Sequence, residues 1–384
     1  MVHGSPFEDF QRILYWQHIT LKLLGCDVFK PNFHRSAVTY FIIFLAGFYM
    51  VISFIDLYLF NDNIFNFIFV LVTFSYGVIG CGRLGFLISQ ATTAAKLVSE
   101  AKQTYKNTTS DKLEQEILLK YTKLLKRCVL FFSIIFLGGV LMCGFLPLMV
   151  FLLNGEKILP FGVIIPLTNP NTDDGYQLNF LYQVSCMFWT PPGLTASQNV
   201  YFALVFNICI QYDLLVLKLQ VLDEMIARNE KGELDMQVRE TLVEIVQNQQ
   251  RLADFITTIE NLYATQTFVE VGSNAMQIVV TLFVLHIDVW LPGYMIILIA
   301  SFQLFLSCLL GTLIDVKNQL FTEKIYNISW HGMKNADQKT LKFMLAQSQR
   351  PLQLSCGRMT TLNMNLFLAV YKKIYSIFMM LQNI

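Results

Sequence analysis

The chain has 384 residues, of which 54% are hydrophobic, 14% aromatic and only 14% charged. The charged share lies well below the roughly 25% that is typical of soluble domains. Together with 33 phenylalanines, this composition excludes an ordinary soluble domain and indicates an integral membrane protein. The net charge of +1 gives no reason to expect a nucleic-acid partner.

Cysteines and histidines are dispersed along the chain. The eight cysteines include no Cys-x-x-Cys pair and no cysteine–histidine cluster, so we expect no metal, no other cofactor and no disulfide framework. The five histidines fall at termini, loops or span ends, and no paired carboxylates stand inside the apolar runs. An enzyme working within the membrane would need such groups there, so an enzymatic function is not expected.

Residues 1–36 mix charged and apolar positions. The first long apolar run begins near Ala37 and lacks a small-residue cleavage site, so no removable signal peptide is expected. Five apolar positions predict a short amphipathic helix on the membrane surface: Phe10, Ile13, Leu14, Leu21 and Leu24. Seven apolar runs follow, each long enough to cross the roughly 30 Å core of a bilayer, which takes about 20 helical residues. We place them at 37–60, 64–89, 128–153, 195–217, 264–286, 291–315 and 357–383. The predicted fold is therefore all-α with seven transmembrane helices.

The distribution of Lys and Arg predicts the orientation in the membrane. Four of these residues lie in 1–36, eight in 90–127, five in 218–263 and six in 316–356, whereas the alternate loops hold only Lys157. Because cytoplasmic loops carry the excess of positive charge, we expect a cytoplasmic amino terminus and an extracellular carboxyl terminus. The glycosylation triplets at Asn107 and Asn327 then face the cytoplasm and should be unused.

Charged residues near the spans fall into two groups. The acidic ones are interpreted as lying close to the membrane interfaces, where the cost of a charge is small: Asp56, Asp213, Glu270, Asp288 and Asp315. Arg83, Arg358, Lys372 and Lys373 lie within spans, and the two lysines are the exceptions that call for a polar environment.

Two kinds of loop are predicted. The external loop 154–194 is rich in Asn, Asp, Gly and Pro; it is interpreted either as a cap over a cavity or as an irregular surface loop. In 218–263, apolar residues recur at intervals of three and four, which predicts amphipathic helices that continue the fourth and fifth spans into the cytoplasm. Residues 336–350 predict a third such helix, with Leu341, Met344 and Leu345 on one side.

The last apolar run has two distinct faces. On a helical wheel, Asn365, Ala369, Lys372, Ser376 and Asn383 fall within about 40° of one line, opposite an apolar face. A polar face must be turned away from lipid, toward neighbouring helices or toward water. The adjacent Lys372 and Lys373 favour a face turned toward water, because lysines buried between helices would need acidic partners.

The carboxyl-terminal third carries a family resemblance. The segments Ile325-Tyr326-Asn327-Ile328-Ser329-Trp330 and Leu345-Ala346-Gln347-Ser348-Gln349-Arg350-Pro351-Leu352 precede Gly357, and Leu362, Asn363, Phe367 and Lys372-x-x-Tyr375-Ser376 follow. In this order and spacing they resemble the insect odorant receptors. The region of resemblance begins near residue 320, and upstream only topology and loop sizes agree.

The resemblance implies a ligand-gated, non-selective cation channel in the plasma membrane of olfactory neuron dendrites, assembled as a tetramer with the family's shared co-receptor. Loop 218–263 is too compact for the co-receptor, so the chain resembles an odorant-specific tuning subunit. A ring of lysines would repel cations, so a heteromer is expected. The implied organisation is a cytoplasmic segment 1–36, a ligand-binding bundle 37–217, an anchor from 218–263 and 316–356, spans five and six in 264–315, and a pore helix 357–384.

The resemblance also implies functional residues. The pore-lining candidates are Asn365, Ala369, Lys372, Ser376, Met380, Asn383 and Ile384. The family's ligand site lies in the outer halves of the second, third, fourth and sixth spans, here 64–76, 139–153, 195–206 and 291–302. Candidates there are Phe69, Thr73, Tyr76, Gly139, Met142, Leu146, Asn199, Phe202, Leu291 and Tyr294, with Tyr294 the leading one. Since these stretches hold no charged residue, a small neutral volatile is expected; for each residue, ordinary core packing is the alternative.

Other receptor classes fit the sequence less well. A gustatory receptor shares the architecture, but Ile374-Tyr375-Ser376-Ile377 departs from that family's ending. A G-protein-coupled receptor would have the opposite orientation and an Asn-Pro-x-x-Tyr motif in the seventh span. No internal repeat suggests a transporter.

Overall fold

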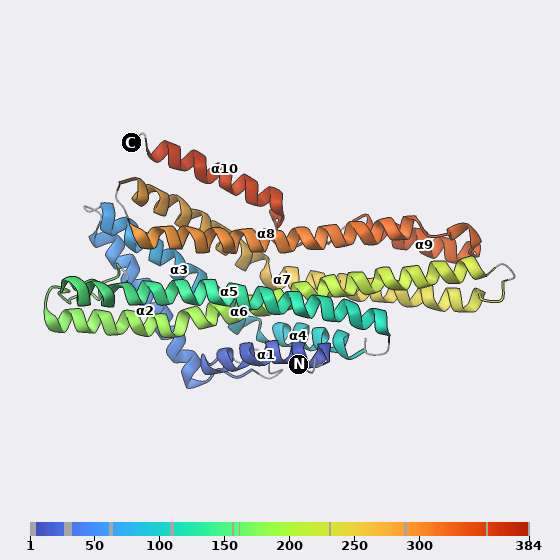
Figure 1. Ribbon diagram of the computed structural model, residues 1–384, viewed down its shortest axis with the longest axis horizontal. Helices are drawn as coiled ribbons and strands as arrows, with labels where there is room; N and C mark the ends of the chain where they lie inside the picture. The colour runs from blue at the N-terminus through green and yellow to red at the C-terminus, as the bar shows by residue number, and fades with distance from the viewer. Residues whose placement is uncertain are drawn as a thin grey trace.

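The computed structural model describes residues 5–26, 33–60, 64–107, 111–155, 157–160, 162–229, 232–287, 290–350 and 352–382. Helices account for nearly all of the regular structure in these residues (Figure 1). The elements are α1 (Pro6–Leu23), α2 (Ala37–Leu59), α3 (Ile64–Ser89), α4 (Ala91–Asn107), α5 (Lys112–Asn154), α6 (Asp173–Arg228), α7 (Asp235–Ile287), α8 (Leu291–Tyr326), a 3-10 turn η1 (Trp330–Gly332), α9 (Asn335–Ser348), β1 (Ser355–Cys356), β2 (Thr360–Thr361) and α10 (Met364–Leu381).

Seven of the described helices are long and apolar enough to cross a membrane, so the prediction of seven spans is confirmed. They are α2, α3, α5, α6, α7, α8 and α10. Three of them are far longer than a bilayer requires: α5 has 43 residues, α6 has 56 and α7 has 53. At 1.5 Å per residue α6 measures about 84 Å, against a bilayer core of roughly 30 Å. The long helices therefore continue well outside the membrane.

This extension forms a helical bundle at one end of the molecule, to the right in Figure 1. There α6 and α7 turn back on each other, and α8 and α9 pack beside them. Its core includes Leu222, Leu242, Ile245 and Ile325, all at most 1% exposed. Apolar residues at helical spacing drive this packing, since each helix alone would leave an apolar stripe in water.

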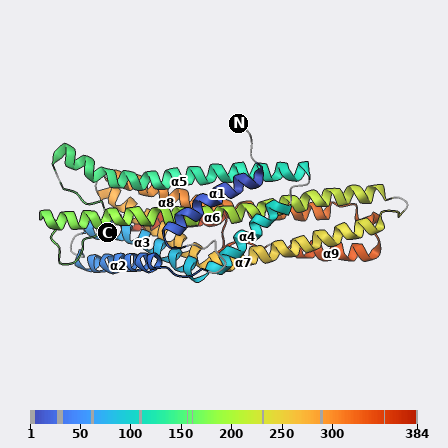
Figure 2. The same cartoon turned by 90° about the horizontal axis from the view of Figure 1, so that it is seen from below.

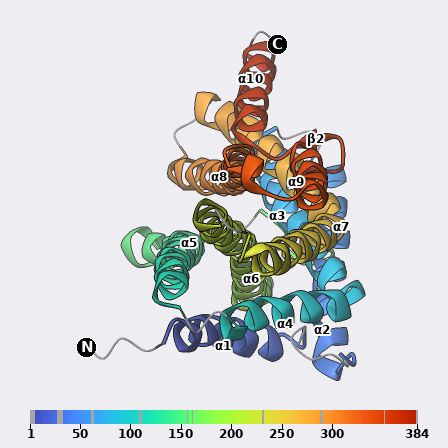
Figure 3. The ribbon, with the colours of Figure 1, turned by 90° about the vertical axis from the view of Figure 1, so that its right-hand side faces the viewer.

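Helix α6 lies at the centre of the molecule when it is seen end-on (Figure 3). The expectation that residues 154–194 form an irregular loop is wrong for its second half, because α6 begins at Asp173. Pro191 and Pro192 lie inside this helix instead of ending a loop. Each proline lacks the N–H that would bond the carbonyl four residues earlier, so Pro191 and Pro192 interrupt the helical hydrogen bonds there. In the next turn Thr195 Oγ1 donates a hydrogen bond to the carbonyl oxygen of Pro191 at 2.8 Å, an additional bond within the helix.

Helix α1 does not display its apolar face to the membrane surface, contrary to the prediction. The five residues predicted to form that face are buried, and all of them except Leu24 belong to the main apolar core of the chain. Phe10, for example, stacks on Tyr105 of α4 with ring centroids 4.1 Å apart. As Figure 2 shows, α1 runs obliquely beneath the long helices. Tyr15, Trp16 and Leu23 form its exposed apolar side.

The chain enters α10 through a small hairpin. Ser355 pairs with Thr361 and Cys356 with Thr360, and Arg358 and Gly357 adopt positive φ angles of 59° and 64° in the turn. The side chain of Asn363 then caps the amino end of α10 by accepting a hydrogen bond from the amide of Leu366. From there α10 diverges from the bundle toward the carboxyl terminus (Figures 1 and 3).

Candidate ligand-binding site

A cavity of about 460 Å³ lies among α2, α3, α5, α6 and α8. This volume falls within the range of roughly 300–1,000 Å³ that holds small organic ligands. Helix α3 forms the longest wall, since its lining residues run from Phe69 to Leu87, about 27 Å along the helix axis. At its far end the cavity reaches Leu21, Leu24 and Cys26, at the end of α1 and just beyond it. The cavity is therefore elongated, and most of its lining side chains are apolar.

Small residues on α3 create room for the cavity wall. A Cβ atom at Gly77 would lie 2.7 Å from Cε1 of Tyr49, so only glycine lets the Tyr49 ring lie against α3. One turn along, the side-chain methyl of Thr190 comes within 3.4 Å of the Cβ position of Gly80. Both neighbours line the cavity, so these two glycines set its width.

The proline-containing part of α6 forms the opposite wall. The stretch from Cys186 to Leu194 contributes seven lining residues, which include Trp189 and Pro191. This part of α6 also packs closely on the end of α1, since a Cβ at Gly193 would lie 2.8 Å from Leu24 Cδ1. The proline pair thus belongs to the site itself.

A cap formed by Ile158, Leu159 and Pro160 covers the outer end of the cavity. The residues that follow are fixed by buried polar side chains. Asp56 Oδ2 accepts from the Ile164 amide at 2.7 Å, Asn179 Oδ1 accepts from the Ile165 amide at 2.7 Å, and Gln183 Nε2 donates to the Val163 carbonyl at 2.6 Å. Of the two interpretations of this segment, the cap is therefore the one that the geometry supports.

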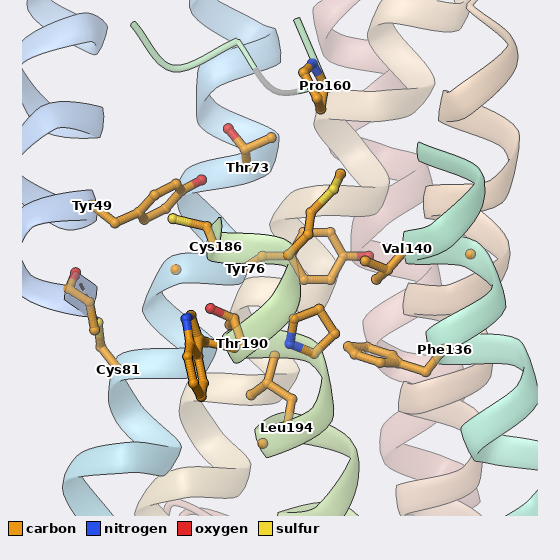
Figure 4. A pocket seen from close by; sticks show the side chains of 18 of the residues that line it. Tyr49, Thr73, Tyr76, Cys81, Phe136, Val140, Pro160, Cys186, Thr190 and Leu194 are labelled. Atoms are coloured by element: carbon orange, nitrogen blue, oxygen red, sulfur yellow. Dashed lines mark hydrogen bonds between the residues drawn. The ribbon is translucent and has the colours of Figure 1, made fainter. Parts of the chain in front are cut away.

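The polar side chains within the apolar wall are few (Figure 4). The hydroxyls of Tyr49 and Thr73 and the thiol of Cys186 come together in one corner, supplied by α2, α3 and α6. The Tyr76 hydroxyl points to the other side of the cavity, toward Val140 on α5. Such an arrangement offers hydrogen bonds at a few fixed points and dispersion contacts elsewhere.

One charged residue, Arg83, also borders the cavity and forms a buried ion pair. Arg83 Nε donates to Glu270 Oε1 at 2.6 Å, and the side chains are only 3% and 9% exposed. The guanidinium also donates to the Leu194 carbonyl at 2.7 Å and to Gln198 Oε1. Glu270, which the sequence analysis expected near a membrane interface, lies buried beside this arginine. The pairing and these further hydrogen bonds offset part of the cost of burying the two charges.

Helix α10 presents its polar stripe away from its own subunit. Asn365, Ala369, Lys372, Ser376 and Met380 are all exposed. On the other side, Ile374 is buried, and Val370, Tyr371 and Leu381 pack against Ile278 and Val279 of α7 and Ala300 of α8. Asn383 and Ile384 lie outside the described residues. The described part of the stripe is therefore available to water or to a neighbouring subunit.

The comparisons with known proteins identify the family. A family model described as 7tm Odorant receptor matches residues 63–375. The chain belongs to the insect odorant receptor family. This is a family of ion channels and not of enzymes, in agreement with the sequence analysis.

Curated relatives of the receptor come from flies and mosquitoes. Putative odorant receptor 83c of Drosophila melanogaster is 22% identical over 250 residues, a match that covers 62% of each protein. Odorant receptor 10 of Aedes albopictus is 22% identical over 280 residues, covering 70% of this chain and 71% of that protein. Odorant receptor 30a of Drosophila melanogaster is 25% identical over 282 residues, covering 70% of each. The receptor thus matches about two thirds of the length of these relatives.

The fold of the receptor matches a solved structure over nearly its whole length. The insect olfactory receptor OR5 from Machilis hrabei, in complex with eugenol, superposes with a TM-score of 0.83 over 98% of this chain and 99% of that chain. A second structure of OR5 from Machilis hrabei superposes with a TM-score of 0.82 over 98% of each chain. At 14% identity these matches show that the fold is shared.

The structure separates the ten ligand-site candidates of the receptor into four groups. Phe69, Thr73, Tyr76 and Gly139 line the cavity. Asn199 and Phe202 are buried elsewhere in α6, and Met142 and Tyr294 are each 56% exposed. The side chains of Leu146 and Leu291 lie outside the described part of the structure, although Pro147 and Pro292 beside them line the cavity. A ligand-binding role for any of them stays a proposal.

Two features explain why the sequence missed other lining residues of the receptor. The sequence analysis began the fourth span at residue 195. Its predicted outer half, 195–206, therefore lies further along α6 than the stretch 186–194 that lines the cavity. Helix α2 contributes Ile42, Leu45, Ala46 and Tyr49, and nothing in its apolar sequence marks them. Arg83 could have been recognised from the sequence, because a charged residue within a span needs a partner and Glu270 lies within a later span.

Proposed function

We propose that this chain is the odorant-binding, tuning subunit of a heteromeric, odorant-gated cation channel in the plasma membrane of insect olfactory neurons. The cavity is the observation that carries this proposal. It combines a volume suited to a small molecule, a mostly apolar wall, and polar groups at fixed points, which is the usual make-up of a small-molecule site. The protein of similar fold from Machilis hrabei is in complex with eugenol, a small volatile, which supports the same class of ligand for this chain.

The placement of α10 supports a pore function for this helix. An amphipathic helix that turns Asn365, Lys372 and Ser376 away from its own bundle needs water or another polar surface on that side. A closed ring of subunits would surround a central space with these faces. Lysine side chains in such a pore repel cations, so we propose that this chain assembles with a co-receptor subunit that lacks them. A tetramer is the assembly we expect.

The connection between α6 and α7 supports the role of tuning subunit. Helix α6 ends at Arg228 and α7 begins at Asp235, so the connection is short. The co-receptor of the family that this chain resembles carries a large insertion in this loop. The connection in this chain is too short to contain such an insertion. The Lys and Arg distribution favours a cytoplasmic amino terminus, which supports our proposal that this helical extension lies inside the cell and forms the anchor between subunits.

Expression in oocytes or cultured cells with and without a co-receptor tests the proposal directly. We expect currents evoked by neutral volatiles only when both subunits are present, with surface labelling to show that each one reaches the plasma membrane. Absence of response to a broad volatile panel, with both subunits at the surface, would contradict the proposal. Equal currents from this chain alone would contradict the heteromer.

A further inference from the structure

The ion pair of Arg83 and Glu270 is out of keeping with a purely apolar ligand site. Both residues are buried, and Arg83 borders the cavity from α3 while Glu270 approaches it from α7. Gln266 Nε2 also donates to Glu270 Oε1 at 2.8 Å, so the carboxylate is held in place from its own helix as well. A charged pair at this depth needs a reason, since apolar residues of similar volume pack a core equally well or better.

The guanidinium retains hydrogen-bonding capacity after these contacts. An arginine carries five N–H groups in a rigid fork. Three of them are directed to Glu270, the Leu194 carbonyl and Gln198, one from each nitrogen. The remaining two, one on each terminal nitrogen, have no acceptor among the described residues, and the residue that bears them borders the cavity.

We propose that Arg83 forms a hydrogen-bond donor subsite in the inner part of the cavity, which selects elongated neutral odorants carrying one acceptor oxygen, such as ketones, aldehydes and esters. This inference rests on the proposed function of the cavity as the odorant site. Arg83 stands seven residues beyond Tyr76 on α3, so it lies about 11 Å deeper along the helix axis. A ligand that reaches from the level of Thr73 and Tyr76 on α3 to Arg83 must therefore be elongated.

Glu270 determines which acceptor the subsite takes. Because its carboxylate already neutralises Arg83, the pair presents donors without a net positive charge. A neutral carbonyl oxygen satisfies these donors at little desolvation cost. An ionised carboxylate would bring a second negative charge into a region of low dielectric with only one cation to balance it. A hydrocarbon would leave the buried donors without an acceptor.

Ligand binding to the purified full-length chain provides a test that does not depend on channel opening. Trp189 and Trp290 line the cavity, so intrinsic fluorescence reports its occupancy. The probes are 2-nonanone, n-decane and nonanoate, which have similar lengths and differ at one end. For the unaltered chain we expect 2-nonanone to bind about tenfold more tightly than n-decane, in line with one hydrogen bond to a charged donor, and nonanoate to bind least.

Two variants test the assignment of roles. In Arg83→Met with Glu270→Gln, both charges are removed together, and the tenfold preference for 2-nonanone over n-decane should be lost while n-decane still binds. In Glu270→Gln alone, the uncompensated arginine should bind nonanoate at least about tenfold more tightly than the unaltered chain does. Lys218→Met with Glu244→Gln removes an ion pair of α6 and α7 that is not among the cavity-lining residues, and serves as the control.

The outcomes are distinct. A gain of carboxylate binding cannot arise from a merely destabilised protein, so that result supports the subsite even where expression falls. The inference would be overturned if the double variant kept the preference for 2-nonanone, or if it lost affinity for all three probes equally. Either result would show that the ion pair has a structural role only. Fluorescence responses to other volatiles but to none of the three probes would also overturn it. No response to any volatile, in fluorescence or current, would instead refute the proposed function.

Discussion

The backbone N–H of Gly357 donates a hydrogen bond to the carbonyl oxygen of Ala264 at 2.9 Å, which ties the hairpin before α10 to the middle of α7. Glu260 strengthens the tie by accepting hydrogen bonds from the amide and hydroxyl of Ser355. Glu270, which pairs with cavity-lining Arg83, lies six residues beyond Ala264, about 9 Å along α7. One rigid helix thus contacts both the wall of the cavity and the start of α10.

Gly357→Ala should therefore reduce odorant-evoked current at equal surface expression. At a φ of 64°, a side chain costs about 1–2 kcal/mol, and the new Cβ would lie 3.0 Å from the Phe268 side chain on α7. Gly155→Ala is the matched control, since φ is 72° there and nothing lies within 4 Å of the new atom. Odorant-evoked currents are recorded for both variants, and only the Gly357→Ala current should be smaller than that of the unaltered chain. Equal losses would show that backbone strain alone is responsible.

The sequence predicted the helices far better than the site. Long apolar runs and loop charges are local signals, and they located the seven spans that the structure contains. The start of α6 was missed because Pro191, Pro192 and the polar residues before them are typical of a loop, whereas packing against α2, α5 and the cap keeps this stretch helical. Lining residues depend on which face of each helix points inward. In an apolar helix such as α2, the neighbouring helices determine which face points inward, so nothing in the sequence marked Tyr49 as a cavity residue.

Gly139→Ala should reorder the potencies of a panel of volatiles. The added Cβ would collide with the end of the Ile299 side chain, which also lines the cavity, so one of them must occupy cavity space. Met142→Ala and Tyr294→Ala change side chains that are each 56% exposed and lie outside the cavity lining, so the ranking should be unaffected. Concentration–response curves for each variant with the co-receptor provide the measurement. A ranking that changes with Tyr294→Ala but not with Gly139→Ala would place the ligand site elsewhere.

Gln183→Leu should weaken every agonist by loosening the cap. The side chain is fully buried and donates to the Val163 carbonyl at 2.6 Å; leaving such an acceptor unpaired costs about 1–3 kcal/mol, or roughly five- to a hundredfold in affinity if the cap opens. Lys157→Gln is the control within the same loop. Its ion pair with Asp173 is exposed to solvent and contributes little. Agonist dissociation rates, measured as current decay after washout, should rise for Gln183→Leu only. Unchanged decay in both variants would argue that the cap does not retain the ligand.

A second buried network should determine thermal stability at the inner end of the bundle. Lys317 Nζ lies 2.6 Å and 2.8 Å from the two carboxylate oxygens of Asp213, the Tyr121 hydroxyl donates to Asp213 at 2.8 Å, and the lysine lies 5.6 Å from the centre of the Tyr121 ring. These contacts join α5, α6 and α8, and the two charged side chains are only 14% and 15% exposed.

Lys317→Met alone should lower the melting temperature of the detergent-solubilised chain, because it leaves the Asp213 carboxylate buried without its cation, at a cost of about 1–3 kcal/mol. Lys317→Met combined with Asp213→Asn removes both charges and should recover most of that loss, since a neutral amide still accepts from Tyr121. Lys334→Met, which breaks an ion pair in which the lysine side chain is 66% exposed, is the control and should shift the melting temperature little. Fluorescence-detected size-exclusion chromatography after heating measures all three. A double variant no more stable than Lys317→Met would show that the lysine acts through its packing and cation–π contact, and not through the charge of Asp213.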